Sequence, residues 1–230
     1  MQQLPLAWII FGVVALLSYL VQLNLKRKFK RYSQVPLDSG LSGREVAERM
    51  LAAYGIQGVR VTCTPGHLTD HFNPLTGTVN LSESVYNQRN VAAAAVAAHE
   101  CGHAVQHAVG YAPLRMRSAL VPVVSFASKW VQWVILAGIL LIQTFPALLL
   151  LGIILFAATT LFSFVTLPVE INASRRAIAW LQEANITSST KQPLAISALR
   201  AAAYTYVVAA LGSLATLVYY ASIYLAHRDD

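Results

Sequence analysis

The stretch "PALLLLGIILFAATTLFSFVTLPVEINASRRA", residues 146–177, is apolar as far as Pro168 and becomes polar from Glu170 onward. Its apolar part is long enough to cross the hydrocarbon core of a bilayer, which needs about 20 residues. Three further stretches of this kind cover residues 4–25, 121–143 and 203–226. We therefore expect a membrane protein with about four transmembrane helices, two of which form a hairpin over residues 121–168.

The overall composition agrees with this expectation. Hydrophobic residues make up 56% of the 230 residues and charged residues only 12%. Charged residues account for about 25% of a typical soluble domain. The low charge content therefore favours a chain that spends much of its length in lipid.

The distribution of basic residues predicts the orientation of the chain in the membrane. Five Lys and Arg lie within residues 26–31, directly after the first apolar stretch, and such clusters stay on the cytoplasmic side. This places the N-terminus outside and residues 33–118 and 169–202 in the cytoplasm. Topology and anionic lipid then account for the net charge of +7, and we expect no nucleic-acid partner.

Residues 33–118 have the pattern of a small α+β domain. "GVRVTC", residues 58–63, and "TVNLS", residues 78–82, alternate as strands do. Asn90 can cap a long helix that runs from Val91 to about Val109 and is closed by Gly110. The fold class we expect is thus a mainly α membrane protein with one small α+β domain.

The predicted long helix carries His99, Glu100 and His103 in the spacing H-E-x-x-H. Residues i and i+4 share one helix face, so both histidines can direct a ring nitrogen to one Zn²⁺. Glu100 then lies beside the metal, where it can take a proton from zinc-bound water and pass it to the leaving amine. The alternative is a helix that simply turns these polar residues to water. The zinc interpretation makes the α+β domain a zinc-protease domain.

A catalytic zinc normally has three protein ligands, so a third is needed. His107 continues the row but stands too far along the helix axis from His99 to share one ion, and it is expected to cap the helix or orient a ligand. Among the carboxylates after the motif, Asp229 and Asp230 fall on the opposite side of the membrane. Glu170 and Glu183 remain, and we expect Glu170 to be the ligand because it follows the third span directly. An ion pair with a neighbouring arginine is the alternative role for Glu170.

Three blocks of the sequence resemble one known family. "LTDHFNPLTGTVNLSESVY", residues 68–86, "VAAHECGHAVQHA", residues 96–108, and "LPVEINASRRA", residues 167–177, are similar to the signature blocks of the YugP-like membrane zinc metallopeptidases. A wider resemblance is to the HtpX-like and CAAX prenyl protease-like gluzincins. These relatives also place a transmembrane hairpin between H-E-x-x-H and a later glutamate ligand. The resemblance implies one zinc ion held by His99, His103 and Glu170.

The wider relatives typically continue E-x-x-A-D, whereas this chain has Ser174 in place of the aspartate. Either Ser174 or Asn172 can then orient a zinc-binding histidine. The resemblance also implies that an edge strand formed by residues 77–85 binds the substrate backbone; an ordinary hairpin strand is the alternative. The residues of this predicted substrate strand are Thr78, Val79, Asn80 and Leu81.

Further polar residues are candidates for stabilising the oxyanion of the reaction. Arg175 can donate hydrogen bonds to it, and Asp70 or His71 can donate to it or orient a ligand. A role in stabilising the local turn is the alternative for Asp70 and His71.

The function predicted from these features is a membrane-integrated zinc endopeptidase of the cell membrane, with its active site on the cytoplasmic side. Its substrates are expected to be proteins or peptides in or near the bilayer. A zinc-binding membrane scaffold without turnover is the alternative. The sequence leaves open the identity of the substrate, the oligomeric state and any regulatory partner.

Overall fold

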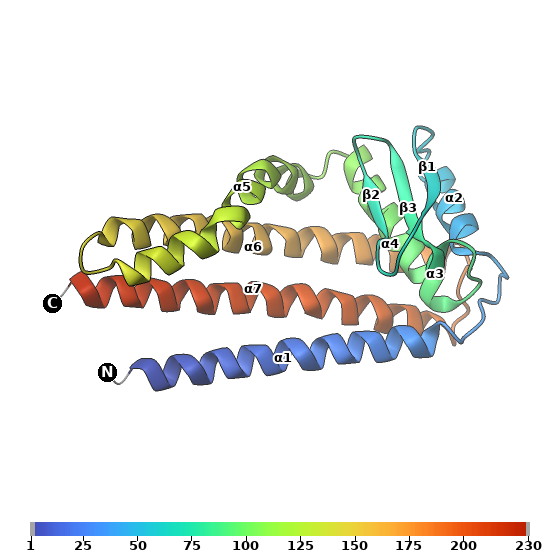
Figure 1. The fold of residues 1–230 in the computed structure, drawn as a ribbon. Coiled ribbons are helices and arrows are strands. Elements are labelled where there is room, and N and C mark those ends of the chain that lie inside the picture. Colours follow the sequence, from blue (N-terminus) through green and yellow to red (C-terminus); the bar gives the residue numbers. More distant parts are fainter. Residues whose placement is uncertain (1–2, 229–230) are drawn as a thin grey trace. The chain divides into compact units, whose positions relative to one another are not determined.

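The computed structural model describes residues 3–228, with side chains from residue 8 onward, and it is mainly helical with one small sheet (Figure 1). Seven helices and three strands follow one another in the described chain. In order they are α1 (Gln3–Tyr32), α2 (Gly43–Ala53), β1 (Arg60–Thr64), β2 (His71–Asn73), β3 (Thr78–Ser82), α3 (Glu83–Tyr86), α4 (Val91–Ala108), α5 (Ala112–Leu140), α6 (Pro146–Glu183) and α7 (Gln192–Arg228). This confirms the expected fold class.

Among the described residues, four helices are long and apolar enough to cross a membrane. They are α1, over Trp8–Tyr32, and the whole of α5, α6 and α7. The helices run further than the apolar stretches on which the prediction rested, because α5 begins at Ala112 and α6 continues to Glu183 without a break. The chain is therefore a multi-pass membrane protein.

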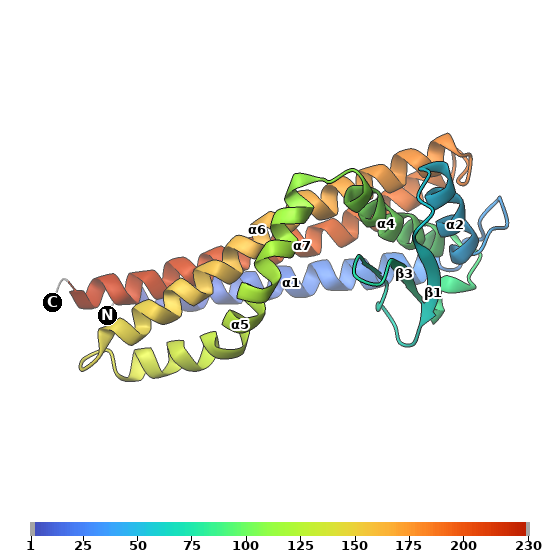
Figure 2. The same ribbon diagram turned by 90° about the horizontal axis from the view of Figure 1, so that it is seen from above.

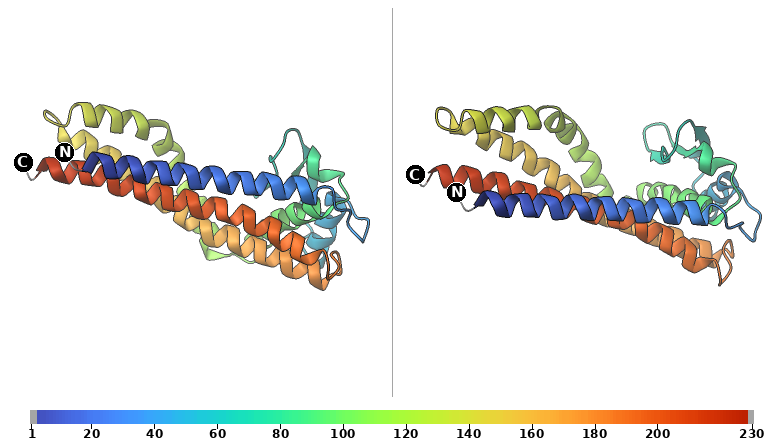
Figure 3. Two further views of the ribbon diagram at one scale, coloured as in Figure 1. Left: turned by 90° about the horizontal axis from the view of Figure 1, so that it is seen from below. Right: turned by 60° about the horizontal axis from the view of Figure 1, so that its bottom comes forward.

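The chain divides into two compact units, which we describe separately. The first, here called the span unit, comprises residues 1–20, 116–167 and 205–230. In it α5 and α6 form a tight hairpin: a Cβ added at Gly138 would lie 2.5 Å from the Leu149 backbone. Thr160 on α6 and Ser213 on α7 share a hydrogen bond of 2.7 Å, and Figures 2 and 3 show these helices side by side.

Large apolar side chains of the span unit are exposed at its surface. Trp8 is 73% exposed, Trp133 67% and Phe126 62%. Exposed aromatic and aliphatic side chains at this density are unusual on a soluble protein but suit contact with lipid.

The second unit, here called the site unit, comprises residues 21–115 and 168–204 and holds the sheet. The strand order is β1-β3-β2, with β1 parallel and β2 antiparallel to β3. The prediction that residues 77–85 form an edge strand is therefore wrong, because Thr78–Asn80 pair with strands on both sides. The reason is that "HFN", residues 71–73, forms a strand too short to show an alternating pattern, and the turn at residues 74–77 folds it back onto β3.

Helix α4 lies at the centre of the site unit. Asn90 caps it as expected, because its side chain accepts a hydrogen bond of 2.9 Å from the Ala93 N–H. The helix ends at Ala108, and Gly110 follows with a φ of +63°, a conformation that favours glycine. Its alanines are almost all buried against the core, and Glu100, His103 and Gln106 are buried with them and not turned to water.

Candidate metal centre

Helices α4 and α6 bring His99, His103 and Glu170 together. The Glu170 carboxylate Oε2 lies 3.2 Å from Nε2 of His99 and 3.7 Å from Nε2 of His103. One ligand atom from each of the three residues can be chosen so that all lie within 4.8 Å of one another. The two histidines, one helical turn apart, therefore converge on one point with the Glu170 carboxylate, which follows His103 by 67 positions in the sequence.

A close approach of backbones makes this convergence possible. A Cβ added at Gly102, in the middle of H-E-x-x-H, would lie 2.6 Å from the carbonyl oxygen of Ala173 and 3.0 Å from its Cα. Only a glycine can fit at this contact without moving one of the helices. Gly102 thus sets the spacing between α4 and α6 at the level of the cluster.

Both histidines are held through their Nδ1 atoms. The Ser174 hydroxyl lies 3.1 Å from Nδ1 of His99, and the Gln106 side-chain oxygen lies 3.1 Å from Nδ1 of His103. Each ring therefore presents Nε2 toward the carboxylate. Of the two candidates for orienting a histidine, Ser174 lies against a ring nitrogen of His99, and Asn172 contacts Gln106.

The donor set and its burial fit zinc. Two imidazole nitrogens and one carboxylate are a common ligand set of catalytic zinc, and each imidazole has the partner on its second nitrogen that such ligands usually have. The side chains are 14% exposed for His99, 10% for His103 and 3% for Glu170. The His99 ring is thus the most accessible of the three from solvent.

The electrostatics of the cluster favour a cation. Burial lowers the pKa of His103, but its hydrogen bond with Glu170 and the charges of Glu100 and Glu170 outweigh this effect, so the pKa lies above its usual value. A positive charge at this position is therefore stabilised by two nearby carboxylates. The same field stabilises a divalent metal ion.

Two further residues of the motif differ sharply in their chemistry. Glu100 is buried, with 8% of its surface exposed, although it follows His99 directly. Cys101 is fully buried, its thiol lies 3.5 Å from the Ala47 carbonyl oxygen, and burial together with the charge of Glu100 raises the pKa of this thiol. Cys101 is thus a packing residue, and Glu100 is the carboxylate available beside the cluster.

Three of the candidate residues make contacts away from the cluster. The Asp70 carboxylate accepts hydrogen bonds from the Ser82 N–H, at 2.7 Å, and from its hydroxyl, at 3.0 Å, which fits the alternative of a turn-stabilising role. His71 has its Nδ1 at 2.8 Å from the Thr69 carbonyl oxygen and its Nε2 at 3.2 Å from the Asn80 amide. The exposed ring of His107 packs at 5.8 Å from that of Phe72.

The candidates of the predicted substrate strand lie on β3, and the others lie on α6. The Asn172 side-chain oxygen accepts hydrogen bonds from Gln106 and, at 2.8 Å, from Arg176. Arg175 and Glu183 are exposed on the helix surface. Gln106 is the residue that the sequence reasoning missed, although a polar side chain three positions after His103 on an alanine-rich helix was a visible signal.

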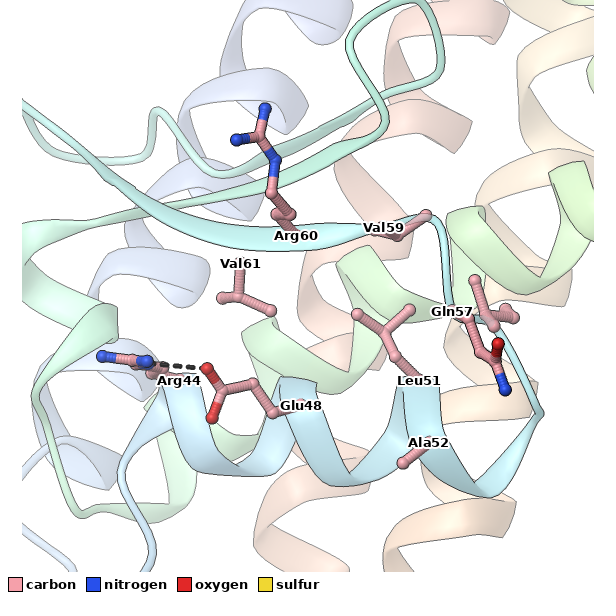
Figure 4. A pocket seen from close by; sticks show the side chains of 9 residues that line it. Arg44, Glu48, Leu51, Ala52, Gln57, Val59, Arg60 and Val61 are labelled. Atoms are coloured by element: carbon pink, nitrogen blue, oxygen red, sulfur yellow. Dashed lines mark hydrogen bonds and ion pairs between the residues drawn. The ribbon is translucent and has the colours of Figure 1, made fainter.

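A pocket between α2 and β1 is separate from this cluster (Figure 4). Val59, Val61 and Leu51 form its apolar walls, and the ion pair of Arg44 with Glu48, at 2.7 Å, lies at its edge. Its lining includes none of the three clustered residues, so we assign it no part in the chemistry of the metal centre.

Comparison with known proteins identifies the family. The sequence model of a family described as "Putative neutral zinc metallopeptidase" matches residues 7–225. The chain belongs to this zinc metallopeptidase family. It is 42% identical over 214 residues to a Bacillus subtilis (strain 168) protein named "Putative membrane protease YugP". The aligned region covers 93% of this chain and 94% of the relative. No solved structure matches the chain.

Family membership and the geometry support the same cofactor. The family is one of zinc peptidases, and the chain has a cluster of two histidines and one glutamate that can hold a metal ion. The relative is a membrane protein by name, and the chain has four helices that can span a bilayer. The resemblance expected from the three sequence blocks is thereby confirmed.

Proposed function

We propose that the protein is a membrane-integrated zinc endopeptidase that cleaves proteins in or near the bilayer. The observation that carries this proposal is the buried convergence of His99, His103 and Glu170 with a further carboxylate, Glu100, next to it in sequence. A site that only stored or sensed zinc would have no use for a buried glutamate outside the ligand set. A peptidase needs such a group as its base.

His99 and His103 would hold the zinc ion through Nε2, and Glu170 would hold it through its carboxylate. Zinc, when bound, supplies Lewis acidity that polarises a peptide carbonyl and makes a water molecule more acidic. Glu100 accepts a proton from the attacking water and returns it to the nitrogen of the leaving amine. The low exposure of Glu100 keeps bulk water from competing for that proton.

The developing oxyanion needs a hydrogen-bond donor from the protein. Arg175 is the best of the predicted donors, because its guanidinium is exposed on α6 one residue beyond Ser174. Both ring nitrogens of His71 are already engaged, by Thr69 and by Asn80. We therefore assign the donor role to Arg175.

The substrate backbone is proposed to add to β2 instead of β3. Strand β2 is at the end of the sheet order and, within the part of the chain that the structure describes, has a strand neighbour on one side only. The contact between Phe72 and His107 places this strand against the end of α4, the helix of the H-E-x-x-H motif. An extended peptide that pairs with the outer edge of β2 would therefore run beside the motif helix.

The side of the membrane is proposed from charge. The basic residues 26–31 follow the apolar part of α1, and such clusters are retained in the cytoplasm. The site unit begins within this same region of the chain, so the metal centre would face the cytoplasm. The proposed substrates are then membrane proteins with cytoplasmic segments, because these segments are accessible to the metal centre.

The test measures zinc per chain and casein hydrolysis in detergent-purified wild type, Glu100→Gln, Glu170→Ala and Glu183→Ala. We expect Glu100→Gln to keep zinc and lose hydrolysis, and Glu170→Ala to lose both. Glu183→Ala is the matched control, because this glutamate is exposed on the same helix and should leave both unchanged. Continued cleavage by Glu100→Gln would exclude Glu100 as the base, and zinc-loaded wild type without hydrolysis would favour a scaffold.

A further inference from the structure

Gln106 on α4 is fully buried, and both its side-chain oxygen and its side-chain nitrogen form hydrogen bonds around the metal centre. Its side-chain oxygen accepts a hydrogen bond of 3.1 Å from Nδ1 of His103. Its side-chain nitrogen donates to the Val169 carbonyl oxygen at 2.8 Å and to the Asn172 side-chain oxygen at 3.0 Å. One side-chain amide thus joins a candidate zinc ligand on α4 to two residues of α6.

The direction of these hydrogen bonds follows from groups that cannot reverse their role. A guanidinium only donates, and the Arg176 Nε lies 2.8 Å from the Asn172 side chain, so Asn172 must present its oxygen there. Gln106 must then present its NH₂ group to that oxygen. The Val169 carbonyl, which only accepts, requires the same orientation. The Gln106 oxygen is left facing His103.

An oxygen at this place requires a hydrogen on Nδ1 of His103. In a neutral imidazole the hydrogen sits on one nitrogen only, so Nε2 then carries the lone pair that a metal needs. We propose that the relay Arg176–Asn172–Gln106 fixes the tautomer of His103 for zinc binding and that Gln106 is its positioning residue. The inference rests on the zinc site of the proposed function and concerns metal affinity, not peptide hydrolysis.

The partner of the other histidine behaves differently. A hydroxyl group can donate or accept, so Ser174, at 3.1 Å from Nδ1 of His99, can hold the ring in place but does not impose one tautomer. The two histidines of the motif are therefore not equivalent. A fixed chain of hydrogen bonds holds His103 with a hydrogen on Nδ1, and His99 is the adaptable ligand.

The first test compares Gln106→Met with Gln182→Met. Methionine keeps the approximate length of the side chain and removes its hydrogen bonds, and Gln182 is an exposed glutamine of α6 that serves as the matched control. Zn²⁺ affinity is measured by chelator competition, and the visible spectrum of the Co²⁺-loaded protein reports ligand geometry. We expect Gln106→Met to bind Zn²⁺ about 10- to 100-fold more weakly with an altered Co²⁺ spectrum, and Gln182→Met to match wild type.

A second pair of variants keeps the proposal testable if Gln106→Met does not fold. Asn172→Asp retains an oxygen for both Arg176 and Gln106, whereas Asn172→Leu removes it. We expect Asn172→Asp to stay within about twofold of wild-type Zn²⁺ affinity and Asn172→Leu to bind more weakly. The loss should be smaller than that of Gln106→Met, because the Val169 carbonyl still holds the amide.

The outcomes separate this inference from the proposed function. Wild-type Zn²⁺ affinity and Co²⁺ spectrum in Gln106→Met, or equal affinities in the two Asn172 variants, would overturn the relay and leave the peptidase proposal standing. A wild-type chain that takes up neither ion would overturn the relay and the zinc site together. Weakened binding in Gln106→Met would support the relay even if the protein cleaved no peptide.

Discussion

The substitution Gly102→Ala should separate α4 from α6 and open the metal centre. The new Cβ would lie 2.6 Å from the Ala173 carbonyl oxygen, where ordinary contact begins at 3.4 Å, so the two backbones must part by about 0.8 Å. The Ala173 atoms that the Cβ meets all belong to the backbone, so no side chain can rotate to relieve the contact. Overpacking of this kind costs about 1–3 kcal/mol of folding free energy.

The same displacement should weaken zinc binding beyond the loss of stability. Glu170 lies on α6 three residues before Ala173, while both histidines flank Gly102 on α4, so a shift of the helices moves the ligands apart. Metal sites tolerate deviations of about 0.2 Å in ligand distance, well below the displacement required. In catalysis a misplacement of about 1 Å can cost about 100-fold in rate, and we expect a loss of Zn²⁺ affinity of similar order.

The assay combines chelator competition for Zn²⁺ with thermal unfolding in detergent. Gly58→Ala is the matched control, because a Cβ at that position meets nothing within 4 Å and both glycines belong to the site unit. A Gly102→Ala protein that unfolds at the wild-type temperature and binds Zn²⁺ with wild-type affinity would refute the argument that Gly102 sets the helix spacing.

Two further predictions concern the histidines. Ser174→Ala removes the contact with Nδ1 of His99 and should weaken Zn²⁺ binding about 10- to 100-fold in chelator competition; unchanged affinity would show that this hydroxyl does not orient the ring. In the zinc-free chain the pKa of His103 lies above its usual value, so protons compete with metal from a higher pH than at an ordinary histidine. Zn²⁺ affinity should fall about tenfold for each pH unit below that pKa, and a pH-independent affinity would contradict this.

Much of the candidate site could be predicted because most of its residues lie at short, regular spacings in the sequence. His99 and His103 one turn apart on a capped helix specify a shared face, and few carboxylates remained for a third position. Gln106 could not be assigned from the same pattern, because its role depends on Asn172 and Arg176, which lie more than sixty residues later. A hydrogen-bond relay between two helices has no local signature in either of them.

The error in the sheet has a different physical cause. Strand order is decided by pairing between segments, and alternation in "TVNLS" shows that a strand exists without showing how many neighbours it has. The three residues of β2 become a strand through their pairing with β3, and Asp70, just before them, is anchored to Ser82. Whether residues 78–82 form an edge strand or a central strand could therefore not be predicted without knowing that β2 pairs with them.

The alanines of α4 are what allow a polar site to be built inside the unit. Ala94, Ala97 and Ala98 are fully buried, and such small side chains let neighbouring elements approach the helix closely. A helix packed this tightly has to provide partners for every polar side chain it carries. Among the described residues no buried side-chain nitrogen or oxygen lacks a hydrogen-bond partner. Larger residues at the alanine positions would hold the neighbouring elements away from α4, and the packing that encloses its polar side chains would be lost.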